Sequence, residues 1–220
     1  MKINADFTQR VVVRFDQTDW VASPMAGVAR KMLDRIGTEV ARATTIVRFD
    51  PGSRFSAHTH DGGEEYLVLD GTFQDESGDY GPGSYVRNPP TSHHTPAATE
   101  GATILVKLHQ FDPDDRTEVV IDTAAADWLA DGRLALFEDA QEYVRLERWA
   151  AGETVDLDAT GGLELFVITG DVTQTDDTLR RWDWLRLPQG GTHSATAGAN
   201  GAQVWIKSGH LAAETKRGAL

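Results

Sequence analysis

The chain has 220 residues, of which 40% are hydrophobic and 25% are charged, with a formal net charge of −13 and no cysteine. This composition is typical of a soluble globular protein, and the length allows one large or two small domains. The acidic balance disfavours nucleic acid and anionic membrane surfaces as partners, because like charges repel. The lack of cysteine excludes disulfides and thiolate ligands, so a bound metal would need histidine, carboxylate or water.

The N-terminal sequence MKINADFTQRVVVRFD has no apolar stretch of the kind found in secretory signals. No apolar run approaches the roughly 20 residues that span a bilayer. We therefore expect a cytoplasmic protein without a membrane partner. Residues 10–15, RVVVRF, predict the first strand, which either packs on its own domain or pairs with a second copy of the chain in a homodimer.

Short runs of β-branched and aromatic residues recur about every 10 residues, separated by Gly, Pro, Asp and Ser. This spacing predicts an all-β protein, built as a sandwich or barrel. Residues 122–132, DTAAADWLADG, have the composition of a helical turn or two, and we place the domain boundary there, with domains over 1–122 and 123–220. The other predicted strands are TTIVRF, EYLVL, GSYVR, ATILVKL, EVVI, EYVRLERW, LELFVI, WLRL and AQVWIK.

The two halves of the chain repeat one pattern at an offset of 99 residues over the central block. Gly71 precedes His94 by 23 positions, and Gly170 precedes His193 by the same interval. A proline stands 18 positions after each of these glycines. We therefore predict one structural unit of about 100 residues that is used twice.

A cluster of side chains suited to metal binding lies in the sequence HTHDGGEEY, residues 58–66. Because side chains alternate along a strand, His58 and His60 point to the same face, about 7 Å apart. The two glycines that follow favour a tight turn, which would bring the next strand back beside the histidines. Alternation places Glu64 and Glu65 on opposite faces, but it does not by itself say which of them joins the histidines.

The same stretch resembles the first cupin motif, in the form Gly52-x5-His58-x-His60-x3-Glu64-x6-Gly71. The following segment resembles the second cupin motif, in the form Gly83-x5-Pro89-x-Thr91-x2-His94. That motif normally has glycine in the position of Thr91. The resemblance implies a small antiparallel jelly roll for each unit, and hence two tandem cupin domains.

The cupin resemblance also implies a ligand set. It selects Glu64 over Glu65 and His94 over His93. It therefore implies a single divalent metal ion inside the first barrel, bound by His58, His60, Glu64 and His94. Tyr66 shares a face with Glu64, so we expect it either to line the ligand pocket or to belong to the ordinary core.

Residues 23–90 closely resemble the ChrR-like cupins. That family includes the zinc-binding domain of anti-sigma factors and stand-alone proteins similar to diketone-cleaving dioxygenases. The resemblance favours zinc as the cofactor, with Fe(II), Mn or Ni as alternatives, and a small-molecule ligand in the first barrel. The anti-sigma factors have a separate helical domain with Cys and His ligands, which this chain lacks, so a sigma-factor partner is not expected.

The second unit has lost most of these ligands. At the 99-residue offset, Leu157, Ala159 and Leu163 stand where the first unit has two histidines and a glutamate. Only His193 remains, and we predict no metal there because one histidine does not make a site. We expect this half to be a structural or regulatory copy.

Three functions are consistent with this pattern, and the sequence leaves open whether the protein is an enzyme. The first is a zinc-binding sensor or ligand-binding protein without turnover. The second is an Fe(II)-dependent dioxygenase that cleaves a small diketone-like substrate. The third is an interaction module for a sigma factor or another regulator.

Overall fold

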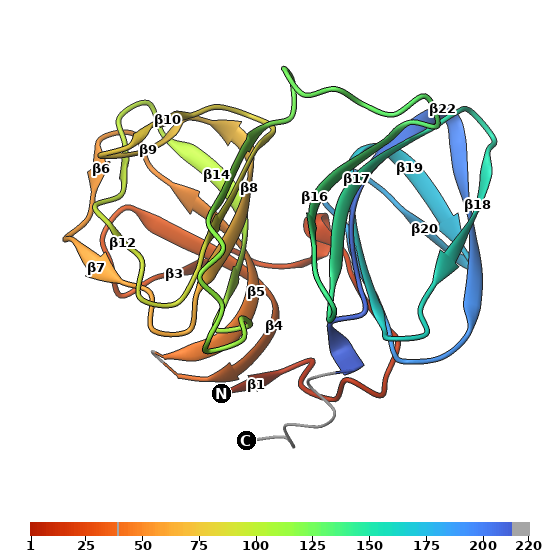
Figure 1. Cartoon of the computed structure of the whole chain (residues 1–220), viewed down its shortest axis with the longest axis horizontal. Coiled ribbons are helices and arrows are strands. Elements are labelled where there is room, and N and C mark those ends of the chain that lie inside the picture. Colours follow the sequence, from red (N-terminus) through yellow and green to blue (C-terminus); the bar gives the residue numbers. More distant parts are fainter. Residues whose placement is uncertain (39, 213–220) are drawn as a thin grey trace. The chain divides into compact units, whose positions relative to one another are not determined.

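A computed structural model describes residues 1–38 and 40–212 of the chain. The chain divides into two compact units, each an antiparallel barrel (Figure 1). The first domain comprises Met1–Ala5 and Asp19–Ala126, and the second comprises Asp6–Thr18 and the described residues from Asp127 onward. The prediction of an all-β chain with two tandem jelly-roll domains is confirmed. None of the described segments forms a helix with the length and apolar character that crossing a membrane requires.

The first domain is built from one large sheet, one small sheet and one isolated strand pair. The large sheet has the order β1-β4-β5-β14-β8-β11-β15, with β3 paired to β4, and the small sheet has the order β10-β9-β13-β6. The remaining pair is β12 with β7. The strands are β1 Lys2–Ile3, β3 Val21–Ala22, β4 Val28–Gly37, β5 Ala41–Phe49, β6 Ser53–Arg54, β7 His58–Thr59, β8 Glu64–Gly71, β9 Phe73–Asp75, β10 Gly78–Tyr80, β11 Ser84–Asn88, β12 His93–His94, β13 Ala97–Ala98, β14 Ala102–Leu108 and β15 Val119–Asp122.

Alternation along the strands gives this domain its core. On β8 the side chains of Tyr66 and Val68 point inward, and they meet Val86 of β11 and Val106 of β14 on the facing positions of the neighbouring strands. These residues belong to one buried cluster, in which aromatic and β-branched side chains dominate. Its members are Val47, Tyr66, Val68, Phe73, Tyr80, Val86, Ala98, Ala102, Ile104 and Val106.

The second domain repeats this plan with longer strands. Its sheet has the order β16-β17-β22-β19-β21-β2, with β18 paired to β22 and β20 paired to β19. The short 3-10 helix η1 spans Phe15–Gln17. The strands are β2 Val11–Val13, β16 Arg133–Glu138, β17 Tyr143–Trp149, β18 Thr154–Asp158, β19 Leu163–Gln174, β20 Asp177–Leu179, β21 Trp184–Leu187 and β22 Thr192–Ser208.

Strand pairing reproduces the sequence repeat residue by residue. His58 lies opposite His94 in the first domain, and Leu157 lies opposite His193 at the same register in the second. The pairing of β8 with β11 at its ligand-bearing end likewise matches that of β19 with β21. The 99-residue offset is therefore a structural correspondence, and the two barrels can be compared position by position.

Each of the two large sheets ends in an edge strand, and the sequence did not reveal the origin of one of them. The strand β2 lies between β1 and β3 of the first domain in the chain but pairs with β21 of the second, with Val11 opposite Arg186. The strand β15 is the last strand of the first domain and pairs with β11 of the same domain, with Val119 opposite Arg87. Because Arg186 and Arg87 correspond at the offset of 99, the two strands occupy equivalent edges. The predicted strand over 10–15 thus forms at Val11–Val13 and packs within this chain.

The stretch 122–132 contains no helix, in contrast to the prediction of a helical turn or two. The carboxylate of Asp122 accepts a hydrogen bond from the backbone N–H of Ala124 at 3.0 Å, and its carbonyl accepts one from Ala125 at 3.2 Å. An aspartate that bonds its own following backbone favours a turn over a helix. Ala124 and Ala125 are exposed, so their packing does not oppose this preference.

Candidate metal centre

Two strand pairings and a glycine turn assemble the predicted metal site. The pairing of β7 with β12 places His58 opposite His94, and the chain then turns back through Gly62 and Gly63 into β8. Gly63 has a φ of +76°, and a Cβ atom there would lie 2.4 Å from the Phe111 ring. Only glycine fits that position, so the turn depends on the glycine from which the sequence predicted it.

The turn before β12 contains the residue that departs from the cupin motif, and its backbone shows why the motif normally has glycine there. Thr91 stands where the second motif normally has glycine, and its φ is +77°. A β-branched residue rarely adopts this left-handed conformation, whereas glycine adopts it readily. The hydrogen bond from the Thr91 N–H to the carbonyl of His60, at 2.9 Å, ties the turn to the histidine strand.

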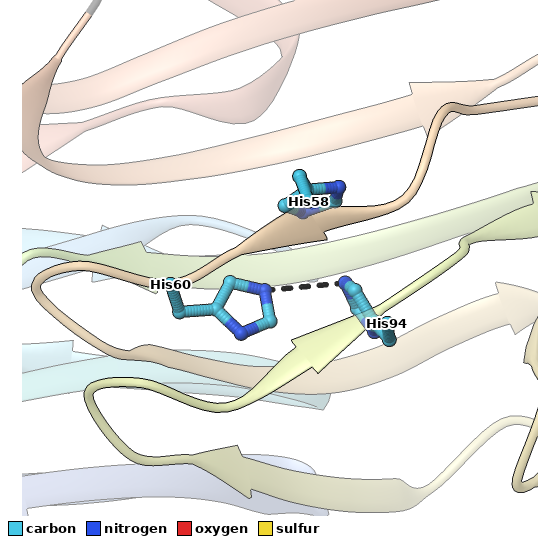
Figure 2. Close-up of side chains that lie close together, drawn as sticks. All are labelled: His58, His60 and His94. Atoms are coloured by element: carbon cyan, nitrogen blue, oxygen red, sulfur yellow. Dashed lines mark hydrogen bonds between the residues drawn. The ribbon is translucent and has the colours of Figure 1, made fainter.

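The four predicted ligands lie close together, with three of them buried. The Nε2 atoms of His60 and His94 are 3.2 Å apart, and the Oε2 atom of Glu64 lies 3.4 Å from the first and 3.6 Å from the second. Ligand atoms of His58, His60 and His94 all lie within 4.8 Å of one another. Figure 2 shows the three side chains that form this group. His58 is exposed and closes the group on its solvent side.

The outward nitrogens of His58 and His60 are held by hydrogen-bond acceptors. The Nδ1 atom of His58 lies 3.2 Å from the carbonyl oxygen of Ser56, which can only accept. The Nδ1 atom of His60 lies 2.9 Å from the hydroxyl oxygen of Ser92. That hydroxyl donates its own proton to the carbonyl of Pro89 at 2.6 Å, so it accepts from His60. Both rings therefore carry their proton on Nδ1, which leaves the Nε2 lone pair free, and that of His60 faces the site.

A carboxylate orients the third histidine in the same way. The Nδ1 atom of His94 lies 3.3 Å from the Oδ2 atom of Asp75, whose side chain is buried. The other oxygen of Asp75 accepts hydrogen bonds from the Tyr80 hydroxyl at 3.2 Å and the Ser77 N–H at 2.8 Å. This is the carboxylate–histidine arrangement that usually supports a metal ligand from behind. Sequence reasoning missed Asp75 and Ser92, because nothing in their local pattern separates them from ordinary turn residues.

The electrostatics of the site put its ligands in the protonation states that a metal requires. In the metal-free protein, burial would raise the pKa of the Glu64 carboxyl, but His60 beside it and the positive charge that the imidazoles acquire on protonation together lower it. Burial lowers the pKa of the His94 imidazole, against the opposing effect of the Glu64 charge. Near neutral pH we therefore expect an ionised Glu64 and a neutral His94.

These contacts allow a test of whether a divalent ion fits. With Nδ1 protonated on both rings, neither Nε2 atom of His60 and His94 has a proton to donate across the 3.2 Å contact drawn in Figure 2. Two lone pairs and the Glu64 carboxylate then face one another, which is unfavourable without a cation between them. Donors bound to one ion at about 2.1 Å lie about 3.0–3.4 Å apart, close to the spacings found here. The donor set fits a divalent metal.

The competing residues lie elsewhere. Glu65 is buried on the opposite face of β8, where it accepts a hydrogen bond from the Tyr85 hydroxyl at 2.8 Å. His93 is exposed, whereas its neighbour His94 is buried in the site. The structure thus places Glu64 and His94 at the site, and Glu65 and His93 away from it, as the motif spacing implied.

Tyr66 lies on the inner face of β8, two residues beyond Glu64, and is 1% exposed. Its ring packs against Phe73, with ring centroids 5.1 Å apart, and lies 6.2 Å from the Tyr80 ring. Burial, followed by the Glu64 charge, raises the pKa of the Tyr66 phenol, which therefore stays protonated. Within residues 1–38 and 40–212, its hydroxyl has no hydrogen-bond partner.

The described residues of the second barrel form no comparable centre. Leu157, Ala159 and Leu163 are fully buried in its apolar core, and His193 is only partly buried opposite Leu157. In the part of the chain that the structure describes, His58, His60 and His94 form the one group of three or more His, Cys, Asp or Glu side chains placed to hold an ion.

Comparison with known proteins agrees with this architecture. Residues 8–112 match the family model described as "ChrR Cupin-like domain". No curated protein gives a significant sequence match. Similar solved structures include a candidate dioxygenase from Nostoc punctiforme, with a TM-score of 0.75 and 14% identity over 93% of this chain and 84% of that one. Protein Ylba from E. coli has a TM-score of 0.72 and 13% identity, covering 93% of both chains.

A further similar structure is the bacterial pirin YhhW from Escherichia coli in complex with nickel(II). Its TM-score is 0.69, with 12% identity over 91% of this chain and 99% of that one. At such low identity these likenesses establish the fold of the whole chain, and the chemistry of the site has to be argued from its own residues.

Proposed function

Since its first domain belongs to the ChrR cupin-like family, we propose that this protein binds one zinc ion in the first barrel and serves as a sensor or binding protein for a small molecule. His58, His60, Glu64 and His94 would hold the ion. When bound, the ion would supply a Lewis acid that polarises an oxygen of the ligand. The second barrel would have no part in metal binding.

One observation carries this proposal: the free Nε2 lone pairs that converge beside the Glu64 carboxylate. Three imidazoles and one carboxylate make a complete set of four donors, which is the number that closes a tetrahedral zinc site. The acceptors behind the rings, which include Ser92 and Asp75, keep these lone pairs aimed at one point. Such preorganisation supports a permanent metal centre, because ligands that must first rearrange bind more weakly.

A metal-dependent dioxygenase is the second candidate. The same donor types suit Fe(II), Mn and Ni as well as zinc. His58 is exposed, so a small molecule can approach the centre from the side of that ligand. The similar structures include a candidate dioxygenase and a nickel-containing pirin, which supports chemistry of this kind on the same fold.

Metal analysis and oxygen uptake together separate the two candidates. The protein is purified without added metal, its metal content is measured, and the metal-free form is reconstituted anaerobically with zinc, Fe(II), Mn or Ni. One zinc per chain, with no oxygen uptake in the presence of small diketones, is the expected result. Oxygen uptake by the Fe(II) form would establish the dioxygenase instead. Failure to retain any of these metals would overturn both candidates.

A further inference from the structure

The buried hydroxyl of Tyr66 is the feature of the first barrel that folding does not explain. A buried hydroxyl without a partner costs free energy, about 1–3 kcal/mol by mutational comparison. Nearly all buried polar groups in proteins are therefore paired, and an exception calls for a cause. The Tyr66 ring could fulfil its packing role against Phe73 as a phenylalanine, without that cost.

The second barrel provides an internal control for this reasoning. At the offset of 99, Leu165 takes the place of Tyr66, and it is fully buried in the apolar core. Leu179 similarly takes the place of Tyr80. The barrel without metal ligands thus packs well with aliphatic side chains at both positions. The tyrosine hydroxyl accompanies the metal ligands and is not required by the fold.

The position of Tyr66 shows what its hydroxyl can reach. It projects from the same face of β8 as Glu64, and its ring packs on Phe73, whose ring centroid lies 6.2 Å from that of the ligand His94. Its ring also lies 6.2 Å from that of Tyr80, whose hydroxyl bonds the Asp75 that supports His94. Tyr66 therefore belongs to the part of the interior that adjoins the metal centre.

We propose that the Tyr66 hydroxyl donates a hydrogen bond to an oxygen of a small carbonyl compound bound at the metal centre, and so contributes to the selection of that ligand. This inference rests on the proposed function, because it needs a metal that accepts an outside ligand. The role is one of recognition, in which a site built to bond an oxygen discriminates against molecules that lack it.

The charge and polarity of the surroundings favour a neutral ligand. Glu64 and Asp75 supply two negative charges beside the centre, which balance the two positive charges of a divalent ion. An anionic ligand would add an uncompensated charge to a buried site, whereas a carbonyl oxygen accepts a hydrogen bond without one. The apolar side chains around the Tyr66 ring suit the carbon skeleton of such a compound.

The test compares Tyr66→Phe with the wild type in two measurements. In the first, the full chain is loaded with Co(II), and its visible spectrum is followed while acetamide, a small neutral carbonyl compound, is added. Tyr66→Phe should retain one Co(II) per chain and bind the probe about 2- to 12-fold more weakly, the range expected for one hydrogen bond. In the second, the melting temperature of the metal-free variant should equal or exceed that of the wild type.

Tyr85→Phe is the matched control, because it removes a buried tyrosine hydroxyl from the paired strand on the other face of the sheet. That hydroxyl bonds Glu65, so its loss should lower the melting temperature and leave probe binding unchanged. Equal probe binding by Tyr66→Phe and the wild type would overturn the inference alone. So would a loss of stability like that of Tyr85→Phe, since the hydroxyl would then have a structural partner. A wild-type spectrum that does not respond to the probe would overturn the ligand-binding function, and the inference with it.

Discussion

The two barrels of this chain keep the same strands and differ in what lies inside them. On the outer face the correspondence is close: Glu65 accepts a hydrogen bond from Tyr85, and Glu164 accepts one from the indole of Trp184 at 3.0 Å. On the inner face three of the four metal ligands of the first barrel are replaced by Leu157, Ala159 and Leu163. The comparison teaches that the metal is not a condition for this fold. A barrel with an apolar interior forms the same sheets without any ligand set.

The largest expected difference between the barrels is in metal binding. His60→Ala removes a buried ligand whose Nε2 lies 3.2 Å from that of His94. It should weaken metal binding beyond the roughly 10- to 100-fold that loss of an outer-shell partner costs. His193→Ala, at the one ligand position of the second barrel that still has a histidine, should leave one ion per chain. Metal content after dialysis measures both, and a loss of metal in His193→Ala would show that the second barrel takes part.

The edge strands β2 and β15 provide the next test, because equivalent positions in them differ in burial. Val12 of β2 packs against the core of the second domain, whereas Val120 of β15 is 56% exposed. Val12→Asp should destabilise the second domain by about 1–3 kcal/mol, and Val120→Asp should change stability by less than about 0.5 kcal/mol. Urea unfolding followed by tryptophan fluorescence reports on this domain, since every tryptophan except Trp20 belongs to it. Equal effects would contradict the assignment of β2 to the second domain.

The third test concerns the support behind the metal ligands. Asp75→Asn keeps the size of the side chain but replaces the carboxylate that accepts from His94, so metal affinity should fall by about 10- to 100-fold. The matched control is Asp79→Asn. Asp79 is a nearby exposed carboxylate that accepts a hydrogen bond from Gln74, so its substitution should leave the metal affinity unaltered. A competition titration with a chromophoric chelator measures both. The second barrel has Gln174 where the first has Asp75, in keeping with its lack of metal ligands.

Much of this architecture was predictable, for reasons that particular residues make clear. The repeat register follows from glycines such as Gly71 and Gly170, whose positive φ and close approach to backbone exclude other residues. The ligand spacing follows from strand alternation and the Gly63 turn. The destination of β2 was not predictable, because an apolar run specifies a strand but not the edge that it joins. Asp75 was missed because it reaches His94 through tertiary structure, over 19 positions of sequence.

The smallest expected effect concerns a pair of residues that recurs where each domain begins. Trp20 lies under the Arg48 guanidinium at 4.4 Å, and Trp128 lies under Arg148 at 3.6 Å. An exposed cation–π contact contributes about 0.5–1 kcal/mol, so Arg148→Gln should destabilise the second domain by about that amount. A double-mutant cycle with Trp128→Leu isolates the pairwise energy from the other contacts of the tryptophan.

The same cycle in the first domain sharpens the comparison between the two. Trp20 also has the Lys31 ammonium at 5.1 Å, and its distance to Arg48 is longer than the corresponding distance in the second domain. The coupling of Arg48 with Trp20 should therefore be weaker than that of Arg148 with Trp128, because attraction to the ring falls with distance and a second cation already occupies it. An equal or stronger coupling energy between Arg48 and Trp20 would contradict this expectation, because the energy would then not follow the local geometry of each pair.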